Sequence, residues 1–144
     1  MIFLDASAAA KRYCLEPGSD RVKDLFAERA SLCSIVLLRC ELASALNRRQ
    51  REGDLSNAER SAARELVSQD LNWLRLVPID EELIDASVRL LDSHPLKTLD
   101  SLYLAGALNL QQLSSIPVLF VSADRQLLRA AKAEGLQVLD PESA

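Results

Sequence analysis

The sequence predicts an α/β fold in which a mostly parallel sheet is covered by helices on both faces. Short apolar runs such as Ile2-Phe3-Leu4 and Val118-Leu119-Phe120-Val121 have the length and composition of strands buried on both sides. Longer segments with helical periodicity separate these runs. This alternation is typical of parallel strands that are connected through helices.

The chain order supports this fold element by element. The expected strands cover residues 1–4, 32–34, 74–79, 118–121 and 137–139. The expected helices cover residues 7–15, a segment opened by Ser19 or Asp20, 35–52, 56–71, 80–94, 98–113 and 124–134. Ser56-Asn57-Ala58-Glu59 is a capping box, and Asp80 and Thr98 are expected to cap the helices that follow them. Pro78 places the third strand at an edge of the sheet, because proline lacks the N–H that a central strand needs.

Composition limits the classes of function. The 144 residues suit a single domain spanning 1–144, and the net charge of −4 excludes a polycationic nucleic-acid coat. The three cysteines lack zinc-site spacing, and this odd count without a signal peptide indicates a reducing cytoplasm. Residues 101–123 carry no charge, but polar residues and Pro117 interrupt them, so we expect no membrane span.

Two aspartates stand where an acid is least expected. Asp5 directly follows the first apolar strand, at the carboxyl end where open α/β sheets form ligand crevices. Asp100 is the only charge in a helix that is apolar nearly all round, and a buried carboxylate without a partner is costly. The alternative role for Asp100 is that of a first-turn acid that interacts with the helix dipole.

Two further acids repeat these placements. Glu41 lies on the apolar side of its helix, one turn from Leu37 and Ala45, and the alternative is a salt bridge to Arg48 or to an arginine elsewhere. Asp124 follows the apolar strand 118–121, where the alternative is a helix N-cap. Asp80 and Asp140 also follow strands, so this position alone cannot identify a site.

Together, Asp5, Glu41, Asp100 and Asp124 favour a divalent metal site. Converging carboxylates repel one another, and Mg²⁺ or Mn²⁺ prefers oxygen ligands and keeps waters for a phosphate substrate. The single histidine, His94, lies far from any cysteine cluster and has no comparable soft site around it.

The chain resembles PIN-domain proteins and, more narrowly, the VapC-type toxins of bacterial toxin–antitoxin pairs. The resemblance rests on four motifs in order: Phe3-Leu4-Asp5-Ala6-Ser7-Ala8, Glu41-Leu42-Ala43-Ser44-Ala45-Leu46, Leu99-Asp100-Ser101-Leu102-Tyr103-Leu104-Ala105 and Phe120-Val121-Ser122-Ala123-Asp124. It implies a PIN-like three-layer sandwich with a four- or five-stranded sheet. It also implies a metal-dependent endoribonuclease that forms a homodimer and is inhibited by a small cognate antitoxin.

The resemblance also assigns roles to residues. Asp5, Glu41 and Asp100 match the three acids of the family site, and Asp124 matches the more variable fourth. Ser7 and Ser122 match small hydroxyl residues that orient acids or water, although Ser7 could instead cap the first helix. Tyr103 stands where related sequences often carry histidine, and no catalytic role is assigned to it.

The sequence hypothesis is hydrolysis of RNA phosphodiesters by a metal-activated water, with the four acids holding Mg²⁺ or Mn²⁺. The alternative is a catalytically silent PIN-like module that binds a partner protein. Candidate phosphate contacts are Lys11, Arg12, Arg48, Arg49, Arg51, Lys97 and Arg125. The RNA sequence that is cleaved, the number of metal ions and the partner of the Arg48–Arg51 segment stay open at this point.

Overall fold

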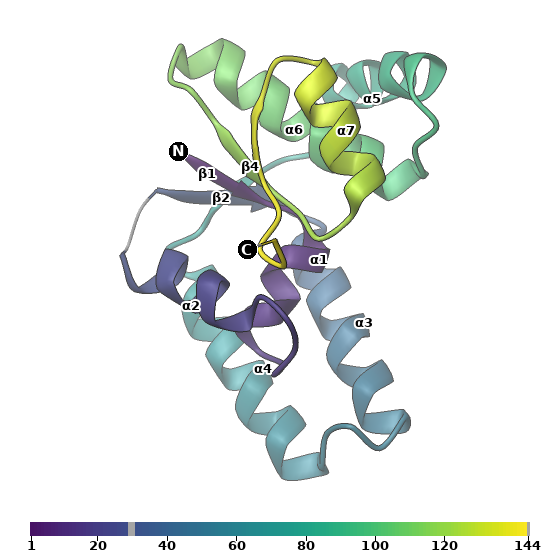
Figure 1. Cartoon of the computed structure of the whole chain (residues 1–144). Helices are drawn as coiled ribbons and strands as arrows, with labels where there is room; N and C mark the ends of the chain where they lie inside the picture. The colour runs from purple at the N-terminus through teal and green to yellow at the C-terminus, as the bar shows by residue number, and fades with distance from the viewer. Residues whose placement is uncertain (29–30, 144) are drawn as a thin grey trace.

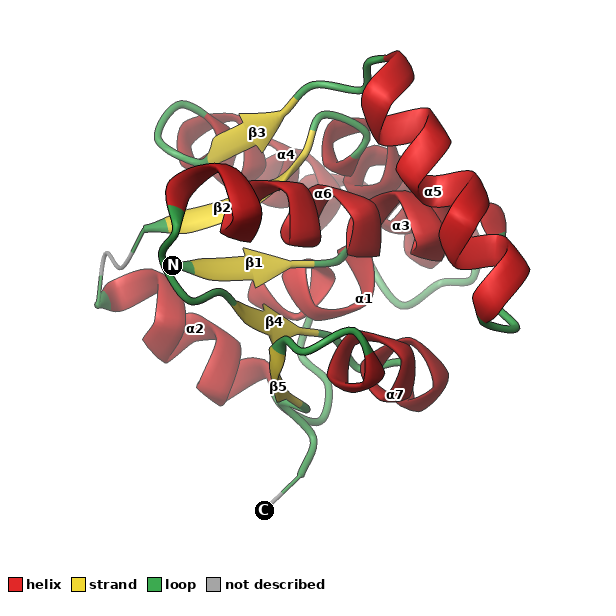
Figure 2. Ribbon diagram, turned by 90° about the horizontal axis from the view of Figure 1, so that it is seen from above, coloured by secondary structure: helices red, strands yellow, loops and turns green. Residues whose placement is uncertain are grey.

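A five-stranded parallel sheet forms the centre of the protein. A computed structural model describes residues 1–28 and 31–143. The strands are β1 (Ile2–Leu4), β2 (Leu32–Ile35), β3 (Arg75–Val77), β4 (Leu119–Val121) and β5 (Gln137–Leu139). They run in the order β3-β2-β1-β4-β5 (Figure 2), and every pairing is parallel. The predicted parallel α/β fold is therefore confirmed, with β3 at an edge as Pro78 indicated.

Helices cover both faces of this sheet. They are α1 (Ala6–Ala9), the 3-10 helix η1 (Ala10–Arg12), α2 (Ser19–Ala27), α3 (Leu38–Arg51), α4 (Asn57–Leu71), α5 (Glu81–Ser93), α6 (Thr98–Ser114) and α7 (Arg125–Ala133). Figure 1 shows α5, α6 and α7 on one side of the strands and α1 to α4 on the other. This is the expected three-layer sandwich. Within the described part of the chain, no helix combines the length and apolarity needed to cross a bilayer.

Alternating strand residues build the two cores that hold these layers together. Phe3 of β1 and Phe120 of β4 stack with ring centroids 6.0 Å apart, on the face that α5, α6 and α7 cover. Their neighbours Leu4 and Val121 point to the opposite face and pack with α1 to α4. Since strand side chains alternate between faces, one short apolar strand supplies both cores.

The helix starts explain most of the element boundaries. Ser56 and Glu59 form the predicted capping box, and Asp80 caps α5 as expected. The predictions that Ser19 or Asp20 caps α2 and that Thr98 caps α6 were wrong. Gly18 caps α2, because the Ser19 hydroxyl instead donates to the Cys14 carbonyl at 2.7 Å. Lys97 precedes α6 and makes no side-chain capping bond.

The strand order places a topological switch point between β1 and β4. The chain moves from β1 to β2 and β3 on one side, and then returns to add β4 and β5 on the other. The connections leaving β1 and β4 consequently diverge and open a crevice beyond the carboxyl ends of these strands. Asp5 directly follows β1 there, and Asp124 comes three residues after the end of β4.

Gly106 makes the close contact between α6 and the sheet possible. A Cβ atom at this position would lie 2.6 Å from Ile35 Cγ2 and 3.1 Å from Phe3 Cζ. We expect Gly106→Val to lower the free energy of unfolding by about 1–3 kcal/mol, because the packed core cannot absorb the extra volume. Urea denaturation measures the change. Gln112→Val on the exposed part of α6 is the control for helix propensity, and equal stability of the two variants would contradict the packing argument.

Candidate active site

Asp5 lies in the crevice between β1 and β4 and is only 3% exposed. Its backbone N–H donates to the Val121 carbonyl at 3.2 Å, which continues the pairing of the two strands by one residue. Its side chain is the N-cap of α1, where Oδ1 accepts from Ala8 N at 2.9 Å. The end of the strand and the start of the helix thus hold this carboxylate in one position.

Two serine hydroxyls surround the same carboxylate. Ser7 Oγ lies 2.8 Å from each Asp5 oxygen, and Ser122 Oγ donates to Oδ2 at 2.8 Å. Ser7 Oγ also accepts from Ala123 N at 2.9 Å, so that the turns after β1 and β4 are linked through one hydroxyl. Ser7 does not cap α1, since Asp5 occupies that position. Of the two roles considered for Ser7, the structure retains the contact with the acid.

Burial dominates the electrostatics of Asp5. It raises the pKa of the carboxyl group from 3.8 to about 6, although hydrogen bonds from Ala8, Ser122 and Ser7 act in the opposite direction. The charge of Asp100 raises it further. Burial therefore disfavours the ionised form of the Asp5 carboxyl group, and the nearby charge of Asp100 disfavours it further.

Asp100 and Glu41 reach the same region from the first turns of α6 and α3. Burial raises the pKa of Asp100, and the charges of Asp124 and Glu41 raise it further, while Lys97 has the opposite effect. No salt bridge joins Glu41 to Arg48 in residues 1–28 and 31–143, so this alternative was wrong. The four acids named from the sequence are thus electrostatic neighbours.

Asp124 both caps a helix and lies near the other acids, which the sequence offered as alternatives. It is the N-cap of α7, where Oδ1 accepts from Gln126 N at 2.8 Å and from Leu127 N at 3.0 Å. Its charge also raises the pKa of Asp100, which places it beside the other acids. Since Oδ1 makes both capping bonds, the second carboxylate oxygen is left for other contacts.

Capping and charge at Asp124 can be separated by substitution. Asp124→Ser keeps a capping oxygen and removes the charge, whereas Asp124→Ala removes both. We expect the alanine variant to be less stable than the serine variant by about 1 kcal/mol, the usual value of an N-cap. Urea denaturation without divalent cations tests this. Equal stability of the two variants would show that the cap contributes nothing.

The donor set suits a hard divalent cation. All four side chains offer carboxylate oxygens, and the pKa values of Asp5 and Asp100 are raised first by burial and then by the charges of neighbouring acids. Among the residues that the structure describes, no three acidic, histidine or cysteine side chains lie close enough together to hold one ion. A cation that three of these acids bind together would therefore have to draw their side chains closer.

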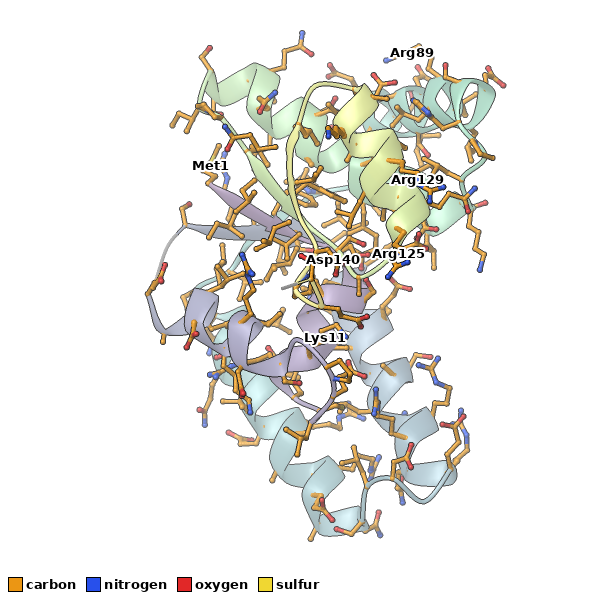
Figure 3. The ribbon with its side chains drawn as sticks, in the orientation of Figure 1. Met1, Lys11, Arg89, Arg125, Arg129 and Asp140 are labelled. Atoms are coloured by element: carbon orange, nitrogen blue, oxygen red, sulfur yellow. The ribbon has the colours of Figure 1, made fainter. Side chains whose placement is uncertain are left out.

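A groove of about 590 Å³ extends from this cluster along α3. Glu41, Ser44 and Arg48 line it at helical spacing, with Ser7 and Lys11 on the opposite wall. Figure 3 shows Lys11 and Arg125 near the carboxyl ends of the strands, one on η1 and the other at the start of α7.

Several of the predicted phosphate contacts already have acidic partners. Lys11 is 3% exposed and pairs with Glu142 at 2.6 Å and with Glu16 at 3.5 Å. Arg12 pairs with Asp70, and Arg49 pairs with Glu16. Arg48 is exposed and lines the groove, which makes it the best placed of these residues to meet a phosphate.

The sequence assigned no catalytic role to Tyr103, which lies beside one of the four acids in the structure. The side chain is 1% exposed. Burial raises the pKa of the phenol beyond its usual range, and a hydrogen-bonding contact with the Glu41 carboxylate and the charge of that group raise it further. The available signal was its spacing, because residues 100 and 103 share one face of a helix.

Comparisons with known proteins agree with this arrangement. Residues 2–133 match the PIN domain family. Ribonuclease VapC46 of Mycobacterium tuberculosis is 31% identical over 140 residues, which cover 97% of each chain.

Solved structures extend the comparison to the fold. The crystal structure of PAE2754 from Pyrobaculum aerophilum superimposes with a TM-score of 0.67 at 20% identity, covering 98% of this chain and 83% of the other. A toxin–antitoxin complex from Klebsiella pneumoniae gives a TM-score of 0.65 at 14% identity and full coverage of both chains. With the family match over most of its length and the VapC relative, the chain belongs to the PIN domain family, among its VapC-type members.

Proposed function

We propose that this protein is a metal-dependent endoribonuclease that acts as the toxin of a toxin–antitoxin pair. The observation that carries the proposal is the electrostatic coupling of four acids near the carboxyl ends of β1 and β4: the charge of Asp100 raises the pKa of Asp5, and the charges of Asp124 and Glu41 raise the pKa of Asp100. Its relative VapC46 is a ribonuclease over the same length of chain. RNA is the substrate class that this relationship supports.

The acids would hold Mg²⁺, or Mn²⁺ in its place. A cation bound among them would lower the pKa of a water molecule and stabilise charge on the phosphoryl oxygens. Asp5 is suited to hold the ion in place, because Ser7 and Ser122 fix both of its oxygens. Asp100 is only partly buried and its pKa is raised, so it is the better candidate to accept the proton of the attacking water.

The groove beside Glu41 would hold the RNA strand. Arg48 lies two turns along α3 from Glu41, on the same wall, where a guanidinium can contact a phosphate next to the scissile one. Ser44 and Ser7 add hydroxyl donors along this path.

Protein partners complete the proposal. The Klebsiella pneumoniae neighbour is a toxin–antitoxin complex, which supports a small antitoxin as the partner of this chain. A homodimer is supported by Ile84 and Val88, which lie one turn apart on α5 and are 43% and 51% exposed. Apolar side chains exposed together on one helix face commonly mark a protein interface.

Cleavage assays test the function directly. Purified chain should cut single-stranded RNA with Mg²⁺ or Mn²⁺, stop when EDTA is added, and recover when excess cation is restored. Cleavage that continues in EDTA would contradict the metal mechanism. Absence of both cleavage and Mn²⁺ binding, in a chain that still binds the protein encoded beside it, would favour the catalytically silent interaction module.

A further inference from the structure

Helix α7 carries three basic side chains on one exposed face. Arg125, Arg129 and Lys132 are exposed, and their spacing of four and then three residues places them in one line along the helix. The opposite face, which includes Leu127 and Leu128, is buried in the core beneath α7. Figure 3 shows Arg125 and Arg129 following one another along this helix. We call these three residues the α7 basic stripe.

The positive charge of the α7 basic stripe is not balanced by acidic partners. Residues 125–133 contain no aspartate or glutamate, and none of the three side chains forms a salt bridge within the described part of the chain. The acids at the two ends of α7 have other contacts, since Asp124 caps the helix and Glu134 pairs with His94 at 2.6 Å. Without the stripe, the net charge of −4 would be −7. This face therefore attracts anions on a protein that is acidic elsewhere.

The α7 basic stripe does not stabilise its own helix. Arg125 is the first residue of α7, where the helix dipole is positive and disfavours a cation. Arg125 and Arg129 are also like charges four residues apart, and such pairs repel on a helix surface. Because both effects oppose helix formation, the stripe requires an explanation outside the helix itself.

The α7 basic stripe begins where the groove of the candidate active site ends. Ala123 lines the groove beside α3, and Arg125 follows it by two residues. At the same end of α7, the Gln126 amide donates to the Pro95 carbonyl and holds the segment before α6 against this helix. Since α3 and α7 belong to opposite layers (Figure 1), the groove and the stripe lead away from the acids on the two sides of the sheet.

We propose that the α7 basic stripe binds the phosphate backbone of single-stranded RNA, beyond the acids as seen from the α3 groove. This inference rests on the proposed ribonuclease function and names a second surface that holds the strand. From Arg125 to Lys132 the helix rises by about 10 Å, which is the length of about three stacked nucleotides at about 3.4 Å each. Such contacts position a strand without reading its sequence. Continuity with the groove favours RNA over an acidic protein surface as the partner.

Two charges of the stripe can be removed without touching the residues next to the acids. Arg129→Gln/Lys132→Gln does this, and Arg21→Gln/Arg64→Gln is the matched control. Both control arginines are exposed, lie on α2 and α4 in the other layer, and change the net charge by the same amount. Glutamine forms helices about as well as arginine and lysine, so both double variants should melt at the wild-type temperature.

The salt dependence of RNA binding tests the inference. Fluorescence anisotropy of a long single-stranded RNA in EDTA, at several KCl concentrations, measures binding without metal-dependent cleavage. The logarithm of the affinity falls with the logarithm of the salt concentration by about 0.7 for each phosphate contact of a single strand, so this slope should be about 1.4 less steep for Arg129→Gln/Lys132→Gln. The control, and Arg129→Lys/Lys132→Arg with both charges retained, should keep the wild-type slope. A wild-type slope in the stripe variant, or an equal change in the control, overturns the inference.

The remaining outcomes separate this inference from the proposed function. If the stripe variant keeps its RNA slope and binds the protein encoded beside it more weakly, the partner is an acidic protein surface and the inference is wrong. If the wild type cleaves RNA while its slope does not depend on the stripe, only the inference fails. If the wild type binds RNA through the stripe and cleaves none with Mg²⁺ or Mn²⁺, the inference holds and the proposed function fails. A wild type that binds no RNA even at low salt overturns the inference, and the cleavage assay then decides the function.

Discussion

Replacing Asp100 with asparagine is expected to reduce RNA cleavage by about 100-fold or more at saturating Mg²⁺, while the protein stays folded. Substitutions that only disturb the orientation of a metal ligand cost 10- to 100-fold, so loss of a ligating and proton-accepting carboxylate should cost at least the upper value. Asparagine preserves the shape of the side chain. The substitution also removes a negative charge that the charges of Asp124 and Glu41 repel, so the free energy of unfolding without cations should rise slightly.

Initial rates on a fluorescent RNA, together with Mn²⁺ titration, measure this effect. Asp85→Asn is the matched control, because Asp85 is an exposed acid on α5 and its loss should leave both quantities unchanged. An Asp100→Asn variant that cleaves within a few-fold of the wild type would remove Asp100 from the catalytic set. A large loss of stability would instead indicate that Asp100 has a structural hydrogen bond.

The sequence singles out the four acids because their local signals are strong. A carboxylate within three residues of the end of an apolar strand, as at Asp5 and Asp124, specifies a position at the carboxyl edge of the sheet. Glu41 and Asp100 are similarly conspicuous, since a lone acid on an apolar helix face has few stable explanations. These patterns need only a few adjacent residues, so they can be recognised without knowledge of the tertiary structure.

Other features depend on contacts between distant residues and could not be predicted in this way. The partners of Lys11 and Arg12 are Glu142 and Asp70, which are far away in the chain. Ser19 is a preferred capping residue by type, but a nearby carbonyl takes its hydroxyl. The closeness of Tyr103 and Glu41 becomes visible only in the folded structure, because the two residues lie on different helices, α6 and α3.

The second large effect concerns stability, and it follows from the raised pKa of Asp5. The native protein holds this proton with a pKa of about 6, whereas the unfolded chain releases it near 3.8. Between these pH values the native state binds more protons than the unfolded state, so the free energy of unfolding falls as the pH rises. The stabilising contribution of the protonated form is complete below about pH 4 and is lost above about pH 6. The difference of about 2 pKa units corresponds to about 3 kcal/mol.

Asp5→Asn should therefore be more stable than the wild type at pH 7.5 in EDTA, by up to about 3 kcal/mol, and should lose this advantage near pH 4. Urea denaturation at several pH values measures the difference, with exposed Asp20→Asn as the control. Saturating Mn²⁺ should reverse the order at pH 7.5, because a cation stabilises the ionised carboxylate of the wild type and finds a weaker ligand in asparagine. If Asp5→Asn is instead less stable by the same margin at every pH, Asp5 serves the fold through Ser7, Ser122 and Ala8. Ionisation of Asp5 would then not lower the free energy of unfolding, and the argument for a cation at this site would rest on Glu41, Asp100 and Asp124 alone.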